Sequence, residues 1–163
     1  GDSFKADNIA MNPPFGSAGK KACQHLELAL LKHFYFYLNN PTRKGRCIAI
    51  LPDTTYVNKY LKKLFSEEFF EEINKEDSYL RSRKRELFKR IKLSYEVLLP
   101  SCTFNRAGTS VLCKIVVIDL INNFNQDKYL RSYDFRDIEK VEKLFEEIEN
   151  LHLPTYMPYK EEL

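Results

Sequence analysis

The feature that most constrains this chain is a pair of adjacent prolines, Pro13 and Pro14, close to its amino terminus. Each proline fixes its own φ near about −65°, lacks an N–H group and keeps the preceding residue out of the helical region. The apolar run Ile9–Met11 ends just before Asn12, so the pattern predicts a short buried strand followed by a rigid loop. In that loop the Asn12 side-chain oxygen and the Pro13 carbonyl are fixed acceptors for one planar NH₂ group, and Phe15 offers a ring for stacking.

The segments after this loop predict a β-α-β unit. Apolar residues recur every three to four positions from Ser17, a candidate helix cap, to Leu38. A continuous apolar run over 46–52 is typical of a central parallel strand that is buried on both faces. The turn Asp53–Thr55 is expected to cap a second helix over 57–73, at the strand end where ligands bind in open α/β sheets.

The second half of the chain predicts two more strands and a helix. The strand-like runs 94–100 and 110–119 flank a loop that contains Asn105 and Gly108, which favours an antiparallel pair. The segment Asp134–Asn150 has the pattern of a capped amphipathic helix.

Two of these segments carry a family resemblance. Asp-x-Ile-x-x-Asn-Pro-Pro-Phe, from Asp7 to Phe15, resembles the catalytic loop of class I S-adenosylmethionine-dependent amino-methyltransferases. It is most similar to the adenine-specific (N6) DNA methyltransferases of restriction-modification systems, phages and mobile elements. Leu-Pro-x-x-x-Phe-x-x-Ala-Gly-Thr, from Leu99 to Thr109, is similar to the terminal β-hairpin of the same family. The resemblance covers about residues 6–119.

The resemblance implies methylation of the adenine amino group in DNA, with S-adenosylmethionine as the cofactor. The resemblance implies that the catalytic loop consists of Asn12, Pro13, Pro14 and Phe15. In that loop Asn12 and the Pro13 carbonyl would accept the amino hydrogens of a flipped-out adenine, and Phe15 would stack on its ring. Phe104 and Thr109 would then wall the base pocket.

The implied fold is a partial Rossmann-like α/β methyltransferase fold with about four strands, the last two antiparallel. The carboxyl-terminal part of the catalytic domain would occupy residues 1–125, and a helix and tail would occupy 126–163. Methylation of RNA or of a protein glutamine amide uses similar loops and stays open at this point. A module without catalysis, which binds nucleic acid or assembles a larger system, is a further alternative.

The family places a Gly-rich cofactor turn and a ribose-binding acid before the catalytic loop, and no such motif stands in this sequence. We therefore expect the carboxyl-terminal half of a methyltransferase domain, with Asp2 and Phe4 as remains of a cofactor-contacting segment. The strand Asp7–Met11 would then lack a neighbour on one side, which predicts self-association or a partner chain.

A basic segment between the predicted strands is the candidate DNA-contacting region. Seven cations fall within residues 81–92, on a stretch whose apolar positions also fit an amphipathic helix with a solvated face. As phosphate contacts we select Arg81, Arg83, Lys84, Arg85, Lys89 and Arg90.

Charge, cysteine content and hydropathy limit which other classes of protein the sequence fits. A net charge of +3 does not by itself indicate a nucleic-acid binder. The four cysteines form no CxxC pair, and His25 and His33 have no third ligand nearby in sequence, so we expect reduced thiols and no metal site. No signal peptide or membrane-spanning run is apparent, which favours a cytoplasmic protein.

Overall fold

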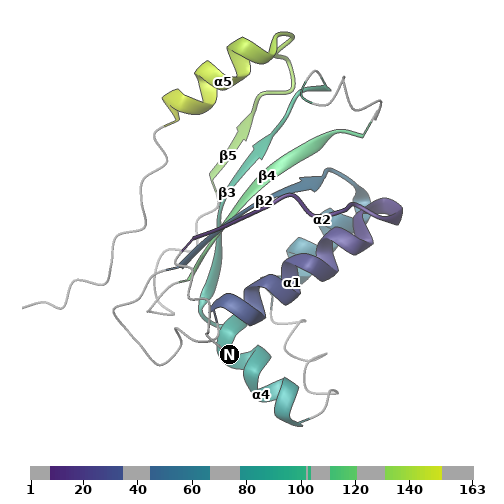
Figure 1. Cartoon of the computed structure of the whole chain (residues 1–163), viewed down its shortest axis with the longest axis vertical. Helices are drawn as coiled ribbons and strands as arrows, with labels where there is room; N and C mark the ends of the chain where they lie inside the picture. The colour runs from purple at the N-terminus through teal and green to yellow at the C-terminus, as the bar shows by residue number, and fades with distance from the viewer. Residues whose placement is uncertain are drawn as a thin grey trace, which may run out of the picture.

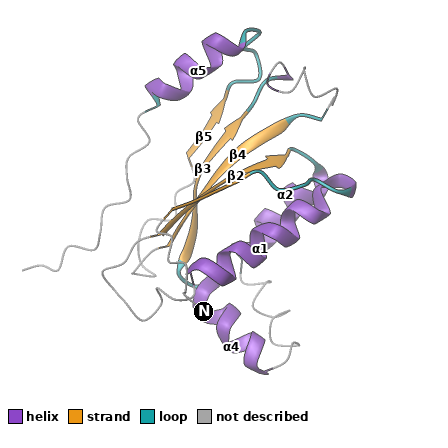
Figure 2. Cartoon of the chain, in the orientation of Figure 1, coloured by secondary structure: helices purple, strands orange, loops and turns teal. Residues whose placement is uncertain are grey.

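The structure, a computed structural model, describes residues 8–34, 45–66, 78–101, 103, 111–120 and 131–151, with only the backbone described at 78–81 and 83. Three of the described helices lie on one side of a mixed sheet, and the last helix lies on the other side (Figure 2). In chain order the elements are β1 (Asn8–Met11), the 3₁₀ turn η1 (Ser17–Gly19), α1 (Lys20–Phe34), β2 (Gly45–Pro52), α2 (Thr55–Leu64), α4 (Ser78–Phe88), β3 (Ile91–Leu98), β4 (Cys113–Leu120), β5 (Arg131–Asp134) and α5 (Val141–Asn150).

The sheet has five strands in the order β1-β2-β4-β3-β5. β1 and β2 are parallel, β4 is antiparallel to both β2 and β3, and β5 is parallel to β3. The α/β class and the antiparallel pair are therefore confirmed. The sheet differs from the expected four strands by β5, whose four residues carry too short a pattern to be predicted.

The main core lies between one face of the sheet and the helices α1 and α2, which lie together on that side (Figure 1). Every second residue of β2 faces these helices, because side chains alternate along a strand. The buried residues of this core include Leu26, Leu30 and Phe34 from α1, Val57, Leu61 and Leu64 from α2, Cys47, Ala49 and Leu51 from β2, and Val116, Ile118 and Leu120 from β4.

The opposite face of the sheet is only partly covered within the described residues. A second cluster is formed by Val97, Leu99, Cys113 and Leu144. β2 was expected to be buried on both faces, and this is wrong at its centre, where Ile48 is 40% exposed. β1 was likewise expected to be buried, but Ala10 is exposed and its neighbours Ile9 and Met11 are half-buried. The β1–β2 end of the sheet therefore offers an apolar surface.

The expected helix over Asp134–Asn150 is wrong in its first half. Asp134 ends β5, and the Phe135 N–H donates to the Leu98 carbonyl at 3.0 Å, so the chain is still paired to β3 there. Tyr133 and Phe135 alternate with exposed neighbours, which is the period of a strand and not of a helix. The helix α5 begins at Val141 and packs its Leu144 into the second cluster.

The first predicted helix also begins later than expected. Ser17 lies in the turn η1 and supplies no side-chain cap, and α1 starts at Lys20. The second predicted helix is confirmed as α2, with Thr54 as its cap: the Val57 N–H donates to the Thr54 hydroxyl at 3.2 Å. The expected ends of both helices, 35–38 and 67–73, lie outside the described residues.

The register of β4 is fixed at one end by a buried charge. Asp119 is 2% exposed, and its carboxylate accepts from Arg46 Nε at 2.7 Å and Arg46 Nη2 at 3.1 Å. The Ser94 hydroxyl also donates to this carboxylate, so β2, β3 and β4 meet at one anion. Arg46 further lies 5.8 Å from the centre of the Tyr95 ring. A bidentate, hydrogen-bonded pair is the arrangement that makes a buried carboxylate tolerable.

Replacing this carboxylate should therefore weaken the fold strongly. We expect Asp119→Ala to lower the free energy of unfolding by about 3–5 kcal/mol, because it leaves the mostly buried Arg46 without a counter-charge. Urea unfolding followed by circular dichroism measures the change. The matched control is Asp134→Ala, which removes an exposed ion pair with Arg136 and should leave the midpoint close to wild type. Equal midpoints for the two variants would contradict the buried-pair account.

β1 lies at the edge of the sheet, and among the described residues it pairs only with β2. An edge strand presents unpaired N–H and C=O groups, and here the exposed Ile48 lies opposite Ala10 in the β1–β2 register. α5 does not cover this edge, since β5 and α5 lie at the other end of the strand order (Figure 1).

We therefore expect the isolated chain to self-associate, or to bind a partner, through the β1 edge. Sedimentation velocity at low micromolar concentration should show a dimer or a larger species. Ala10→Lys, which places a charge on the exposed face of β1, should shift the distribution toward monomer without unfolding the chain. A cooperatively folded monomer in the unmodified chain would contradict this expectation.

Candidate active site

The loop Asn12–Gly16 leaves the sheet at the carboxyl end of β1. Because β1 and β2 are parallel and Met11 pairs with Ala49, this loop and Asp53 lie at the same edge of the sheet. This is the edge at which open α/β sheets bind their ligands. The chain thus places its double-proline loop where a substrate would enter.

Exposure alternates along the loop. Asn12 and Pro14 are exposed, Pro13 is buried, and Phe15 is half-buried. Pro13 therefore anchors the backbone that carries the Asn12 side chain, and that carboxamide is the loop acceptor most open to a ligand. Phe15 packs against both hydrophobic clusters, so part of its ring belongs to the core while another part remains accessible.

A tight turn holds the loop against α2. Gly16 and Gly19 have φ of 66° and 88°. A Cβ on Gly16 would lie 2.6 Å from Lys21 Cβ, and a Cβ on Gly19 would lie 2.7 Å from Pro52 Cγ. The Thr54 hydroxyl donates to the Ala18 carbonyl at 2.7 Å while it also caps α2. The loop that follows Asn12 and the amino end of α2 are therefore joined directly.

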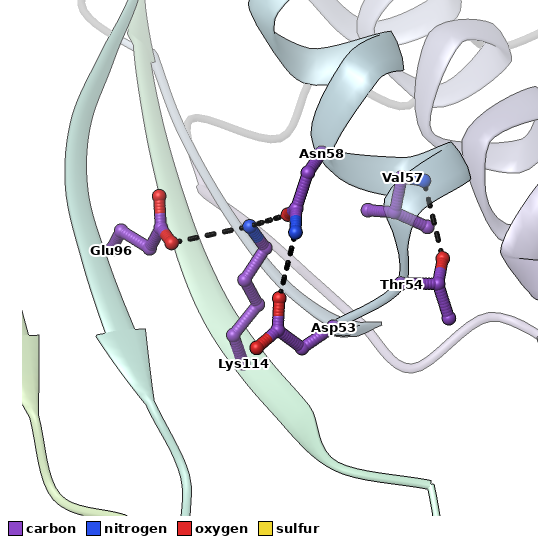
Figure 3. A network of polar contacts seen from close by, with 6 residues as sticks. All are labelled: Asp53, Thr54, Val57, Asn58, Glu96 and Lys114. Atoms are coloured by element: carbon purple, nitrogen blue, oxygen red, sulfur yellow. Dashed lines mark hydrogen bonds and ion pairs between the residues drawn. The ribbon is translucent and has the colours of Figure 1, made fainter.

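A polar network around one buried lysine lies beside this edge (Figure 3). Lys114, the second residue of β4, is 2% exposed and donates to the Asn58 side-chain oxygen and to Glu96 Oε1, the latter at 3.2 Å. Asn58 Nδ2 in turn donates to Asp53 Oδ1 at 2.9 Å. Figure 3 shows Lys114 reaching from β4 toward Asn58 on α2, with Glu96 on the neighbouring strand. The network fixes the side chain of Asp53, which follows β2.

A cavity of about 630 Å³ runs from this network along the helical face of the sheet. Its apolar lining comes from α2, α4 and β3, and four lysines add positive charge. The lining residues are Asp53, Asn58, Leu61, Lys62, Phe65, Phe88, Lys89, Ile91, Lys92, Leu93, Glu96, Leu98 and Lys114.

The thiols of the described residues are not suited to nucleophilic chemistry. Burial raises the pKa of Cys23 and Cys113 to about 11 and that of Cys47 to about 12. All three are free cysteines and stay protonated at neutral pH, which removes the nucleophilic thiolate. Within the described part of the chain no cluster of His, Cys, Asp or Glu has the arrangement of a metal site.

The basic segment on α4 lies far from Asn12. β3 begins three residues after α4, and its first residue Ile91 pairs with Leu120, which pairs with Gly45 at the start of β2. The length of β2, at roughly 3.3 Å per residue, separates this end of the sheet from the Asn12 edge by about 25 Å. The α4 cations therefore do not surround the Asn12–Gly16 loop.

The cations of this segment have different surroundings. Lys84 forms an ion pair with Glu27 of α1 at 3.2 Å, whereas Arg85 and Lys89 are exposed and Arg90 is half-buried. For Arg81 and Arg83 only the backbone, within α4, is described. Their assignment as phosphate contacts stays a prediction. The other predicted site residues, Phe104, Thr109, Asp2 and Phe4, lie outside the described residues.

The turn at Gly16 and Gly19 leaves no open space for a nucleotide-like group beside these two glycines. A Gly-rich turn holds such a group because its glycines leave room for a close approach. Here the space beside Gly16 is filled by Lys21, and the space beside Gly19 is filled by Pro52 and Val57.

Sequence reasoning located the loop but missed the polar network. Apart from Asp119, Lys114 is the one charged residue of β4, and Asn58 and Glu96 are distant in sequence, so their meeting depends on the insertion of β4 between β2 and β3. The available signal was the lone lysine within a Val- and Ile-rich run. A buried lysine needs an acidic or carbonyl partner, but the sequence does not name it.

Comparison with known proteins gives matches among solved structures only. No family model and no curated sequence matches the chain. The M protein of the type I restriction enzyme EcoKI is 21% identical with a TM-score of 0.45, over 83% of this chain and 27% of that protein. A modification subunit of a putative type I restriction enzyme from Vibrio vulnificus YJ016 is 19% identical with a TM-score of 0.46, over 92% and 31%.

A chain from a type I restriction-modification complex is 18% identical with a TM-score of 0.44, over 90% of this chain and 29% of its own length. The chain thus spans less than a third of each of these proteins. Separately, no described helix has the length and apolar character needed to cross a membrane.

Proposed function

We propose that this chain is the substrate-binding part of an S-adenosylmethionine-dependent DNA methyltransferase that modifies the N6 amino group of adenine. The observation that carries the proposal is the position of Asn12-Pro13-Pro14-Phe15, an accessible amide on a fixed loop at the ligand-binding edge of an α/β sheet. The reaction itself, methyl transfer to an adenine amino group, is inferred from the resemblance of this loop to the family's catalytic loop.

In this proposal Asn12 and the Pro13 carbonyl accept the two amino hydrogens of a base that has left the stack. When the amino group donates both hydrogen bonds to the loop, the lone pair of its nitrogen points away from the loop. These bonds also increase the nucleophilicity of the nitrogen toward a methyl group. The accessible part of the Phe15 ring stacks on the base, while the part within the core keeps the ring in place. Catalysis by these residues is positioning of the acceptor nitrogen.

In this proposal the cofactor would supply the methyl group from a site beside the Asn12 loop. The rigid edge around Asn12, fixed by Pro13 and by the Thr54–Ala18 hydrogen bond, is what this chain contributes. Preorganisation of that kind matters because an acceptor that is misplaced loses most of its effect on the rate.

The test is Asn12→Ala in the complete protein that carries this chain. We expect kcat for methyl transfer to DNA to fall by about 10²–10³-fold with an unchanged melting temperature, because the lost acceptor acts in the transition state and the side chain is exposed. The matched control is Asn8→Ala, the same substitution at an exposed residue of β1, which should retain wild-type turnover.

Wild-type turnover in Asn12→Ala would remove the catalytic role of the loop. Activity on RNA or on a glutamine-containing protein, without activity on DNA, would instead transfer the same loop to one of those substrates. Absence of methyl transfer to all three would favour a module that binds nucleic acid without catalysis.

A further inference from the structure

A second hollow, of about 550 Å³, lies on the exposed side of α2. We call it the α2 hollow; its lining residues are Tyr56, Lys59, Tyr60, Lys62, Lys63 and Ser66. It is thus built from three lysines, two tyrosines and a serine, all of which carry hydrogen-bond donors. Among the described residues no acidic side chain lines it, and α2 itself contains none.

The three lysines share one side of the helix. Lys59 and Lys62 are three positions apart, and Lys59 and Lys63 are four apart, spacings that bring side chains together on a helix surface. Like charges at this spacing repel, so the arrangement disfavours the isolated helix. In the described part of the chain neither Lys59 nor Lys62 takes part in an ion pair, and both are exposed.

The carboxylate that contacts Tyr60 of the hollow already has two partners. Glu27 of α1 accepts from the Tyr60 hydroxyl at 2.8 Å and pairs with Lys84 at 3.2 Å. Burial, together with Glu27, raises the pKa of Tyr60, so this hydroxyl remains a donor at all physiological pH values. Within the described residues, the charges of Lys59 and Lys62 are therefore left without a carboxylate partner and can meet an anion from outside the molecule.

The α2 hollow also begins close to the edge of the sheet that carries the Asn12–Gly16 loop. Thr54, the cap of α2, is hydrogen-bonded to Ala18 just after the Asn12 loop, and the 40%-exposed Tyr56 stands in the first turn. A ten-residue helix extends for about 15 Å. A DNA strand carries one phosphate per roughly 3.4 Å of helix axis, so α2 is long enough to face several phosphates in a row.

We propose that the α2 hollow binds the phosphate backbone of DNA next to the target base. This inference rests on the proposed function, and it moves the main phosphate contact from α4 to the helix that adjoins the Asn12 loop. Lys62 also lines the larger cavity together with Lys89, so the positive surface continues from the hollow toward the end of α4. An acidic protein would meet the same lysines, but the position beside the Asn12 edge favours the nucleic acid.

The test measures binding of the full chain to a short fluorescent DNA duplex by anisotropy at several salt concentrations. Each phosphate contact contributes about 0.9 to the slope of log K against log salt. The variant Lys59→Gln/Lys62→Gln should therefore reduce this slope by about two. Lys63 is left unchanged because it takes part in another interaction.

The matched control is Lys32→Gln/Lys140→Gln, which removes the same charge from two exposed lysines outside the hollow and should leave the slope unchanged. An absence of DNA binding at low salt, an unchanged slope in the hollow variant, or an equal fall in the control would each overturn the inference. So would a hollow variant that loses binding to polyglutamate but keeps the DNA slope, since the hollow would then serve an acidic protein.

The result is separable from that of the catalytic test. Asn12→Ala should keep the wild-type salt slope, because Asn12 carries no charge. If the complete protein methylates DNA while the hollow variant binds as wild type does, the function stands and this inference fails. If the slope falls by two while no methyl acceptor is found, the phosphate surface stands and the proposed reaction fails.

Discussion

The fold depends on how β4 is held in the middle of the sheet. It carries a buried charge near each end, Lys114 and Asp119, and each is neutralised by partners from other elements. Arg46 of β2 and Ser94 of β3 satisfy Asp119, while Glu96 of β3 and Asn58 of α2 satisfy Lys114. A slip of one residue would turn both charges to the wrong face. These two pairs therefore select one register among several that an apolar strand would allow.

That register determines how the side chains are arranged at the edge of the sheet that carries the Asn12–Gly16 loop. With β4 fixed, β2 ends beside the amino end of β4, and Asp53 is drawn toward Asn58 through the Lys114 network. The Thr54 that follows caps α2 and is tied to Ala18, which steadies the turn behind the Asn12 loop. The proposed function needs a rigid loop, and here the loop is held by its prolines on one side and by α2 on the other.

The local parts of this arrangement were predictable from sequence, and the long-range parts were not. Pro13 and Pro14 predicted the loop, and the apolar runs predicted β2 and the antiparallel pair, because these signals are contained in neighbouring residues. Burial of β2 was overestimated at Ile48, since which face a helix covers depends on the whole sheet. β5 was missed because four residues give no clear period. The cations of residues 81–92 were visible as a cluster, but their distance from Asn12 follows only from strand pairing.

The central claim is that this edge presents an exocyclic amino nitrogen of DNA for methylation. The most direct measurement is transfer of a labelled methyl group by the complete protein to unmethylated DNA, followed by digestion of the DNA to nucleosides and their separation. The account predicts that the label appears in N6-methyladenosine of the deoxy series. Label in a cytosine C5 position would contradict it, because a carbon acceptor has no amino hydrogens for Asn12 and the Pro13 carbonyl to accept.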